Sequence, residues 1–174
     1  SVGMNPDGED IANSYNHHLI TDQLRGQYGY DGVVCTDWGI TGDETGVETF
    51  AGKPWGAEHL SVAERHYRIL LAGVDQFGGN NDKGPVLEAY KMGVAEMGEE
   101  AMRARFEASA VRLLTNIFRT GLFENPYLDP AETAKTVGCP EFMQEAYEAQ
   151  LASIVMLKNS AGLIKEKTDK EPLE

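Results

Sequence analysis

An acidic and an aromatic residue stand side by side where an apolar run of the chain ends. Residues 33–36 read Val-Val-Cys-Thr, and Asp37, Trp38 and Gly39 follow directly. A short β-branched run without alternation predicts a strand that is covered on both faces, as in a parallel sheet. Because ligands of α/β proteins bind at the carboxyl ends of such strands, Asp37 and Trp38 form our candidate site.

These two residue types suit chemistry on a sugar. A carboxylate can attack or stabilise a cationic carbon, and the face of an indole ring can stack on the apolar face of a pyranose. The residues alone leave two other interpretations open: Asp37 can cap the turn that follows it, and Trp38 can be a structural core residue.

Three further acidic residues follow in the long loop after Gly39. They could line the mouth of a site, although a solvated surface is the simpler interpretation. These residues are Asp43, Glu44 and Glu48. If the chain hydrolysed a sugar by itself, its second carboxylate would come from this set or from Asp75.

The histidines and the second glycine-rich segment do not predict a metal or phosphate site. His17 and His18 are adjacent on a predicted helix and should face different ways, and Glu64 and His66 lack the spacing of metal ligands. Residues 78–81 (Gly-Gly-Asn-Asn) are not followed by the Lys-Ser/Thr of a phosphate loop. We expect no metal and no cofactor.

The elements that must position Asp37 follow from periodicity. A helical pattern covers residues 10–27. Ser61 and Glu64 fit a capping box, which predicts a helix that ends at Gly73. Residues 74–77 (Val-Asp-Gln-Phe) predict a second short strand. We expect the two strands to be parallel neighbours, with the helix crossing between them.

The remaining segments are predicted to be mainly helical. Amphipathic patterns cover residues 84–97, 99–119 and 140–158, whereas residues 1–9 predict a loop and the charged tail at 165–174 predicts disorder. Alternation of strands and helices indicates an α/β fold with a parallel sheet. Two strands cannot close such a sheet, so we expect a domain that is incomplete or completed by another chain. The first residues read as cut from a longer protein.

The composition excludes some classes of partner. The 174 residues include 28 acidic and 15 basic residues, for a net charge of −13. This charge repels phosphate backbones and anionic lipids, and no apolar stretch reaches the ~18 residues of a membrane span, so we expect neither nucleic acid nor membrane as a partner. Cys35 and Cys139 are too few for a disulfide framework, and Cys35 is expected to be a small core residue. Localisation stays open.

A longer pattern surrounds the candidate site. Residues 16–39 read NHHLITDQLRGQYGYDGVVCTDWG. They resemble the retaining β-glucosidases of glycoside hydrolase family 3, with an Asn, a short helix that ends in Leu-Arg, an aromatic-Asp-Gly, an apolar strand and Ser/Thr-Asp-Trp-Gly. Segments that also resemble the family follow in the same order: Ala72-Gly73-Val74-Asp75, Arg112-Leu113-Leu114, residues 121–127 (GLFENPY) and residues 153–159 (SIVMLKN).

The resemblance implies the C-terminal part of a TIM (β/α)8 barrel, an α/β fold with a helix-rich C-terminal part. Residues 1–120 would contribute the last strands and helices of the barrel. Residues 121–164 would form a helical connector toward an absent α/β sandwich domain, and residues 165–174 a disordered tail.

The resemblance also implies a mechanism. Asp37 would be the catalytic nucleophile, forming a covalent glycosyl-enzyme that water hydrolyses with retention, and Trp38 would form part of the wall of the glycosyl subsite. The substrate would be a β-linked glycoside or oligosaccharide of open sugar identity. In the family the general acid is a Glu of the second domain, so we expect the chain by itself to be inactive.

A second function remains open: a non-catalytic fragment or interaction module that folds or associates without turnover. In both cases the exposed sheet edges predict association with the remainder of its own enzyme or self-association.

Overall fold

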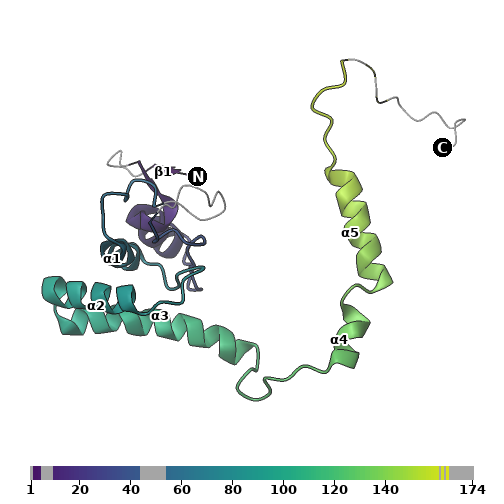
Figure 1. Ribbon diagram of the computed structural model, residues 1–174. Helices are drawn as coiled ribbons and strands as arrows, with labels where there is room; N and C mark the ends of the chain where they lie inside the picture. The colour runs from purple at the N-terminus through teal and green to yellow at the C-terminus, as the bar shows by residue number, and fades with distance from the viewer. Residues whose placement is uncertain (1, 5–9, 44–53, 161, 163, 165–174) are drawn as a thin grey trace, which may run out of the picture. The chain divides into compact units, whose positions relative to one another are not determined.

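The structure, a computed structural model, describes residues 2–4, 10–43, 54–160, 162 and 164. The chain divides into two compact units, Ser1–Glu124 and Asn125–Glu174. Helices make up most of the described residues (Figure 1). Of these helices, none combines the length and the apolar character that a membrane span needs.

The chain begins with a small antiparallel pair of strands rather than with a loop and a helix. Strand β1 (Val2–Met4) pairs with β2 (Asp10–Ala12), and a 3-10 turn, η1 (Asn13–Tyr15), follows. The helix η2, of π type, covers only His18–Gln27. The predictions of a loop over residues 2–4 and of a helix from residue 10 are therefore wrong, and residues 5–9 lie outside the described residues.

The late start of η2 has a local cause and a tertiary cause. The Oδ1 atom of Asn16 accepts a hydrogen bond from the main-chain N–H of Leu19 at 3.0 Å, as a residue at a helix start does. Before it, Ile11 and Ala12 are both buried, and the N–H of Ala12 donates to the carbonyl of Trp55 at 2.9 Å. In a helix that began at residue 10, the N–H of Ala12 would lie in the first turn and have no acceptor within the helix. The extended backbone of β2 gives this N–H an acceptor instead.

Helix α1 (Val62–Ala72) forms as predicted. The Ser61 hydroxyl accepts from the N–H of Glu64, and the Glu64 carboxylate accepts from the N–H of Ser61, which completes the capping box. Gly73 ends the helix with a left-handed φ of 103°. The buried side chain of Ile69 packs into the core between α1, β2 and η1.

The two predicted strands lie side by side and parallel, joined by a single bridge between Cys35 and Gln76. The N–H of Thr36 donates to the carbonyl of Gln76, and the N–H of Asp75 donates to the carbonyl of Val34, both at 2.9 Å. Their predicted adjacency and direction, with α1 between them in sequence, are confirmed. Their length as regular strands is not, because among the described residues each segment has only the other as a bridged strand neighbour.

Helices α2 (Gly84–Met97) and α3 (Glu99–Arg119) confirm the predicted amphipathic segments. Gly98 separates them with a φ of 89°. Met102 of α3 is fully buried and packs with Ala89 of α2 and with Leu70 of α1 in a second core cluster. This cluster attaches the α2–α3 pair to the helix that precedes the Asp75 segment.

The second unit contains α4 (Pro130–Thr136) and α5 (Pro140–Ser153), in which no residue is buried. The predicted helix over residues 140–158 ends five residues early. Ile154 has extended backbone, with φ −71° and ψ 119°, and β-branched residues favour that conformation. Residues 165–174, the predicted disordered tail, lie outside the described residues.

Candidate active site

Asp37 is exposed and lies directly after the bridged segment. Its Oδ1 atom accepts a hydrogen bond from the main-chain N–H of Trp38 at 2.7 Å. Within the described residues, its other carboxylate oxygen has no hydrogen-bond partner. One oxygen is thus held by the first N–H of the following turn, and the other is open for chemistry.

Trp38 lies flat against a glycine pair. A Cβ atom at Gly78 would lie 2.7 Å from Cε3 of Trp38, and one at Gly79 would lie 3.1 Å from its Cδ1. Contact between the indole and this backbone therefore requires glycine at Gly78. Trp38 as a residue is still 64% exposed, so it is not a core residue within the described part of the chain.

A hollow of about 360 Å³ adjoins Trp38, and we call it the Trp38 hollow. Its lining combines Cys35, Trp38, Gln76, Phe77 and residues 78–81. Amide side chains and exposed glycine backbone offer hydrogen-bonding groups beside an aromatic face, the combination that sugar-binding surfaces use.

Thr36 ties the Asp37 segment to the glycine pair. Its hydroxyl accepts a hydrogen bond from the N–H of Gly78 at 2.8 Å and donates one to the carbonyl of Asp37 at 2.9 Å. A second tie joins the N–H of Gly39 to the carbonyl of Gly78 at 3.1 Å. Sequence reasoning did not single out Thr36, because nothing local indicates that its hydroxyl meets a residue 42 positions away.

His66 fixes the far end of the glycine-rich segment. It lies fully buried in α1, with its Nδ1 2.7 Å from the carbonyl of Val62 and its Nε2 2.8 Å from Nδ2 of Asn80. Since Nδ1 must donate to the carbonyl, Nε2 accepts from the Asn80 amide. Burial lowers the pKa of His66, against a smaller opposing effect of the Val62 carbonyl, so the ring is held neutral. The ring thus bonds to α1 itself through Nδ1 and holds the glycine-rich segment to α1 through Nε2.

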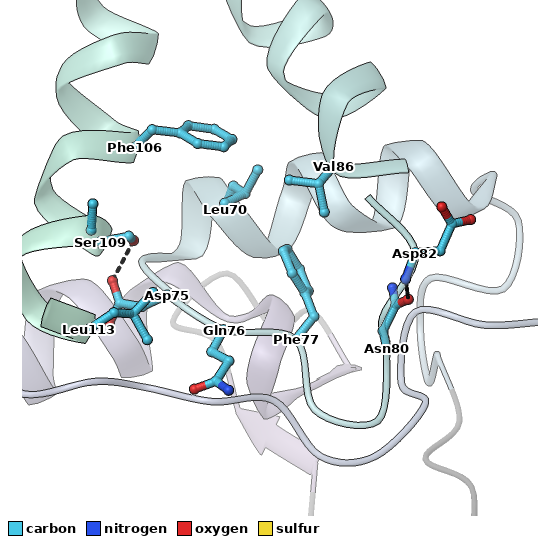
Figure 2. A pocket seen from close by; sticks show the side chains of 11 residues that line it. Leu70, Asp75, Gln76, Phe77, Asn80, Asp82, Val86, Phe106, Ser109 and Leu113 are labelled. Carbon is cyan, nitrogen blue, oxygen red and sulfur yellow. Dashed lines mark hydrogen bonds between the residues drawn. The ribbon is translucent and has the colours of Figure 1, made fainter. Parts of the chain in front are cut away.

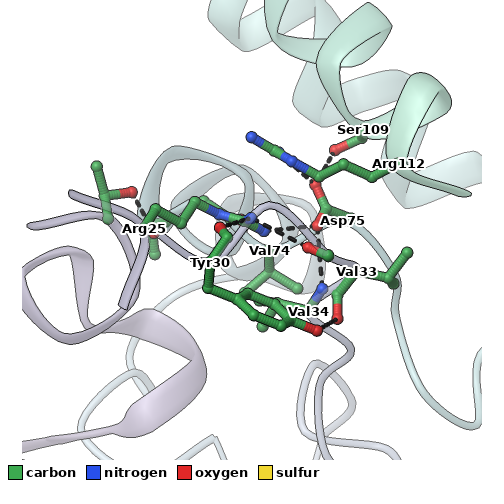
Figure 3. Close-up of polar contacts among 12 residues, drawn as sticks. Arg25, Tyr30, Val33, Val34, Val74, Asp75, Ser109 and Arg112 are labelled. Atoms are coloured by element: carbon green, nitrogen blue, oxygen red, sulfur yellow. Dashed lines mark hydrogen bonds and ion pairs between the residues drawn. The ribbon is translucent and has the colours of Figure 1, made fainter. Parts of the chain in front are cut away.

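Asp75 is a fully buried carboxylate that joins three parts of the first unit (Figure 3). Arg25 of η2 donates to its Oδ2 at 2.6 Å, and the N–H of Val34 donates to the same oxygen at 3.0 Å. From α3, the Ser109 hydroxyl and Arg112 donate to Oδ1 at 2.6 and 2.9 Å. Both oxygens are occupied, so Asp75 is not available as a second catalytic carboxylate.

The charge state of Asp75 follows from these contacts. Burial alone would raise the pKa of Asp75, but the hydrogen bonds from Ser109, the Val34 N–H and Arg112, with the charge of Arg25, together hold that pKa below its usual value. The carboxylate is therefore ionised and paired. Neither Arg25 nor Arg112 had been assigned to Asp75 from sequence, although both lie in segments that carry the family resemblance.

A second cavity, of about 370 Å³, lies on the α3 side of the Asp75 segment (Figure 2). Its walls are mainly apolar and include Leu70, Phe77 and Phe106. Asp75 borders it with the Ser109 hydroxyl bound to its Oδ1. Gln76, Phe77 and Asn80 line both this cavity and the Trp38 hollow, so the two are neighbours, whereas Asp37 lines neither.

The weaker acidic candidates either pair with another residue or lie outside the described residues, and Cys35 is not in the core as expected. Asp43 pairs with Nη1 of Arg65 at 2.7 Å, with 76% of its side chain exposed. Glu44 and Glu48 lie outside the described residues. Cys35 is exposed rather than in the core, since among the described residues the Gln76 segment is the one bridged to it.

The two adjacent histidines correct a prediction of orientation. The Nδ1 atoms of His17 and His18 lie 3.5 and 3.2 Å from the carboxylate of Asp22, so the rings share a partner instead of facing different ways. His17 immediately precedes η2 and already has helical backbone dihedrals, with φ −58° and ψ −43°. Among the described residues, no cluster of His, Cys, Asp and Glu has the geometry of a metal site.

Comparison with known proteins places these residues in a wider context. No family model matches the chain. A "Periplasmic beta-glucosidase/beta-xylosidase" of Dickeya chrysanthemi is 40% identical over 162 residues, which cover 87% of this chain and 24% of that protein. The "Beta-glucosidase C" of Emericella nidulans is 36% identical over 157 residues, covering 90% and 24%. The "Beta-glucosidase BoGH3A" of Bacteroides ovatus is 30% identical over 148 residues, covering 84% and 17%.

The chain is homologous to proteins named as β-glucosidases and β-xylosidases. It spans about a quarter of the length of the first two curated relatives. The homology extends along most of the chain, so it covers the candidate site together with the helices that support it.

Proposed function

We propose that this chain is the nucleophile-bearing part of a retaining β-glycosidase. The observation that carries the proposal is the exposed Asp37 carboxylate, with one oxygen open, beside the exposed face of Trp38. Homology to β-glucosidases over most of the chain supports a glycoside as the substrate class. The substrate is a β-linked glycoside or oligosaccharide.

The proposed reaction proceeds in two displacements. The open oxygen of Asp37 attacks the anomeric carbon, while the bond to the leaving oxygen breaks and that oxygen takes a proton from an acid outside this chain. Water, deprotonated by the same acid's conjugate base, then attacks the anomeric carbon and releases the Asp37 carboxylate. Two inversions leave the anomeric configuration unchanged.

In architectural terms, we propose that residues 1–120 are the last strands and helices of a (β/α)8 barrel. The parallel bridge between Cys35 and Gln76, with α1 between the two segments in sequence, supports a βαβ unit. Residues 121–164 would connect this barrel to a second, α/β sandwich domain, and residues 165–174 would form a flexible tail. The other barrel strands and the second domain would then be the partners that cover the exposed segment edges.

The test uses a 2-deoxy-2-fluoro-β-glucoside with a dinitrophenyl leaving group on the complete enzyme that carries this sequence. The fluorine slows hydrolysis of the glycosyl-enzyme, so the labelled peptide can be identified by mass. We expect the label on Asp37. Asp37→Asn should keep the fold and lose turnover by about 10⁴-fold or more, since an amide cannot form the ester.

Asp43→Asn is the matched control, because it removes an exposed carboxylate six residues away that pairs with Arg65. It should leave turnover close to the wild-type value. Label on Asp43 or on any carboxylate other than Asp37 would refute the assignment.

The alternative is a non-catalytic module. The two proposals agree on the residues of this chain and differ in whether the complete protein hydrolyses a glycoside. The isolated 174-residue chain should show no Asp37-dependent hydrolysis of an aryl β-glucoside under either proposal, because the proposed acid lies outside it. A complete enzyme that binds the fluoro-glucoside without forming a covalent bond would favour the non-catalytic interpretation.

A further inference from the structure

Thr36 is placed to control the geometry of its neighbour Asp37. The residue is 5% exposed, and its hydroxyl makes two hydrogen bonds. It accepts from the N–H of Gly78 at 2.8 Å and donates to the carbonyl oxygen of Asp37 at 2.9 Å. The hydroxyl therefore links the main chain of Asp37 to a backbone segment that comes from beyond α1.

The peptide group between Asp37 and Trp38 is consequently held at both ends. The carbonyl at one end accepts from Thr36, and the N–H at the other end donates to Oδ1 of Asp37 at 2.7 Å. A peptide is a rigid plane, so a rotation that freed the carbonyl would also move the N–H away from Oδ1. The Thr36 hydroxyl thus acts on the Asp37 carboxylate through the orientation of this plane.

We propose that Thr36 is a positioning residue that fixes the Asp37 carboxylate in the orientation for attack. This inference rests on the proposed function, because it assumes that Asp37 is the nucleophile. Trp38 belongs to the same rigid unit, since its ring lies on Gly78 and Gly79, the segment to which Thr36 is bonded. Loss of the hydroxyl should therefore act on the Asp37 carboxylate, while the packing of the indole on Gly78 and Gly79 does not need the hydroxyl.

The main-chain pairing of the two segments does not depend on the Thr36 side chain. The N–H of Thr36 donates to the carbonyl of Gln76 at 2.9 Å, and the N–H of Gly39 donates to the carbonyl of Gly78 at 3.1 Å. Both bonds are main chain to main chain and persist when the side chain changes. A Thr36→Val substitution keeps the branched shape and replaces the hydroxyl by a methyl group, so it removes the link from Gly78 to the Asp37 carbonyl while the main-chain pairing stays.

The experiment compares four forms of the complete enzyme: wild type, Thr36→Val, Thr36→Ser and Thr21→Val. The Thr21 hydroxyl also donates to a distant carbonyl, that of Ala72, at 2.9 Å, and joins η2 to the end of α1 without contact to Asp37. It is a control for the general effect of losing one threonine hydrogen bond. The measured quantities are the rate constant for trapping by the fluoro-glucoside, kcat and KM for an aryl β-glucoside, and Tm.

We expect Thr36→Val to slow trapping and to lower kcat by about 10- to 100-fold, because small misplacements of a reacting group cost about this much. KM should change less than kcat, since the ground-state sugar contacts remain. Thr36→Ser should restore a rate close to the wild-type value. Thr21→Val should lower Tm comparably and leave the trapping rate unchanged.

A folded Thr36→Val enzyme that is trapped at the wild-type rate would overturn the inference, as would a Thr36→Ser enzyme as slow as Thr36→Val. If Thr36→Val does not fold, Thr36→Ala replaces it, and trapping at the wild-type rate counts against the inference in the same way. Failure of the proposed function looks different, because the wild-type enzyme would then carry the label on another residue or carry none.

Discussion

Replacing Asp75 by asparagine should destabilise the first unit more than any surface charge substitution. Asp75→Asn keeps the size and one acceptor oxygen of the side chain and removes its charge. The wild-type carboxylate is fully buried and lies 2.6 Å from Nη2 of Arg25 and 2.9 Å from Nη1 of Arg112. These guanidiniums keep only 11% and 25% of their side-chain surface exposed, so water cannot fully replace the lost partner.

The expected loss can be compared with that of an ion pair of nearly equal length. Removing one member of a buried ion pair typically costs about 3–5 kcal/mol, because it leaves an uncompensated charge. Asp43 lies 2.7 Å from Arg65 and is 76% exposed, whereas the Arg65 side chain is only 4% exposed. Without the Asp43 charge, Arg65 still donates to the carbonyls of Ala57, Thr41, Gly42 and Glu58. Because Asp43 itself is solvated and Arg65 keeps these acceptors, Asp43→Asn should cost less than Asp75→Asn, about 1 kcal/mol.

Urea unfolding followed by circular dichroism measures both losses on the 174-residue chain. Near-equal losses for Asp75→Asn and Asp43→Asn would refute the reasoning, because burial would then not decide the energy of the pair. A second check uses pH. The pKa of folded Asp75 is lowered, so its contribution is present above the ordinary value of 3.8 and is lost as the pH falls through the lowered pKa. Asp75→Asn should remove this part of the acid destabilisation.

Three further predictions concern single side chains. Trp38→Ala in the complete enzyme should reduce kcat/KM about fivefold, in line with a stacking energy of about 1 kcal/mol, whereas a fall in Tm with unchanged substrate constants would indicate a structural tryptophan. Met102→Ala should lower the free energy of unfolding by about 2–5 kcal/mol, measured with urea. Met97→Ala, at a position 41% exposed, should change it by no more than about 0.5 kcal/mol. Equal losses would contradict the assignment of Met102 to the core. Because burial lowers the pKa of folded His66 below its ordinary 6.5, stability should fall as the pH drops below 6.5, where only the unfolded chain takes up the proton. His66→Leu should flatten this dependence, and an unchanged slope would show that other groups cause it.

Local patterns in the sequence determined the helices and the location of the candidate site. The capping box of Ser61 and Glu64 and the glycine at Gly73 set the bounds of α1, because caps act within one turn of the helix. The position of Asp37 directly after an apolar run predicted a candidate site at the end of a strand, and the structure has an exposed carboxylate there. Whether that carboxylate is the nucleophile remains a prediction.

The predictions from sequence were wrong where a residue contacts a segment far along the chain, or where fewer segments adjoin it than its apolar surroundings suggest. Ile11 has the spacing of a helix residue, yet it lies in β2 because its segment pairs with β1 and is buried against later parts of the chain. Cys35 was expected in the core because its run is apolar, yet it is exposed, with a single bridged neighbour among the described residues. Periodicity indicates which residues tend to be buried, but it does not indicate which other segments are there to cover them.

Only the tertiary structure decided how the candidate site is held. The bond from Gly78 to the Thr36 hydroxyl spans 42 positions, and those from Arg25 and Arg112 to Asp75 span 50 and 37. Each of these groups looks ordinary in its own segment, because a hydroxyl or a guanidinium has many possible partners within the chain. The choice among them is made when α1 brings the Asp75 segment beside the Asp37 segment, since the buried polar groups must then find partners at that contact.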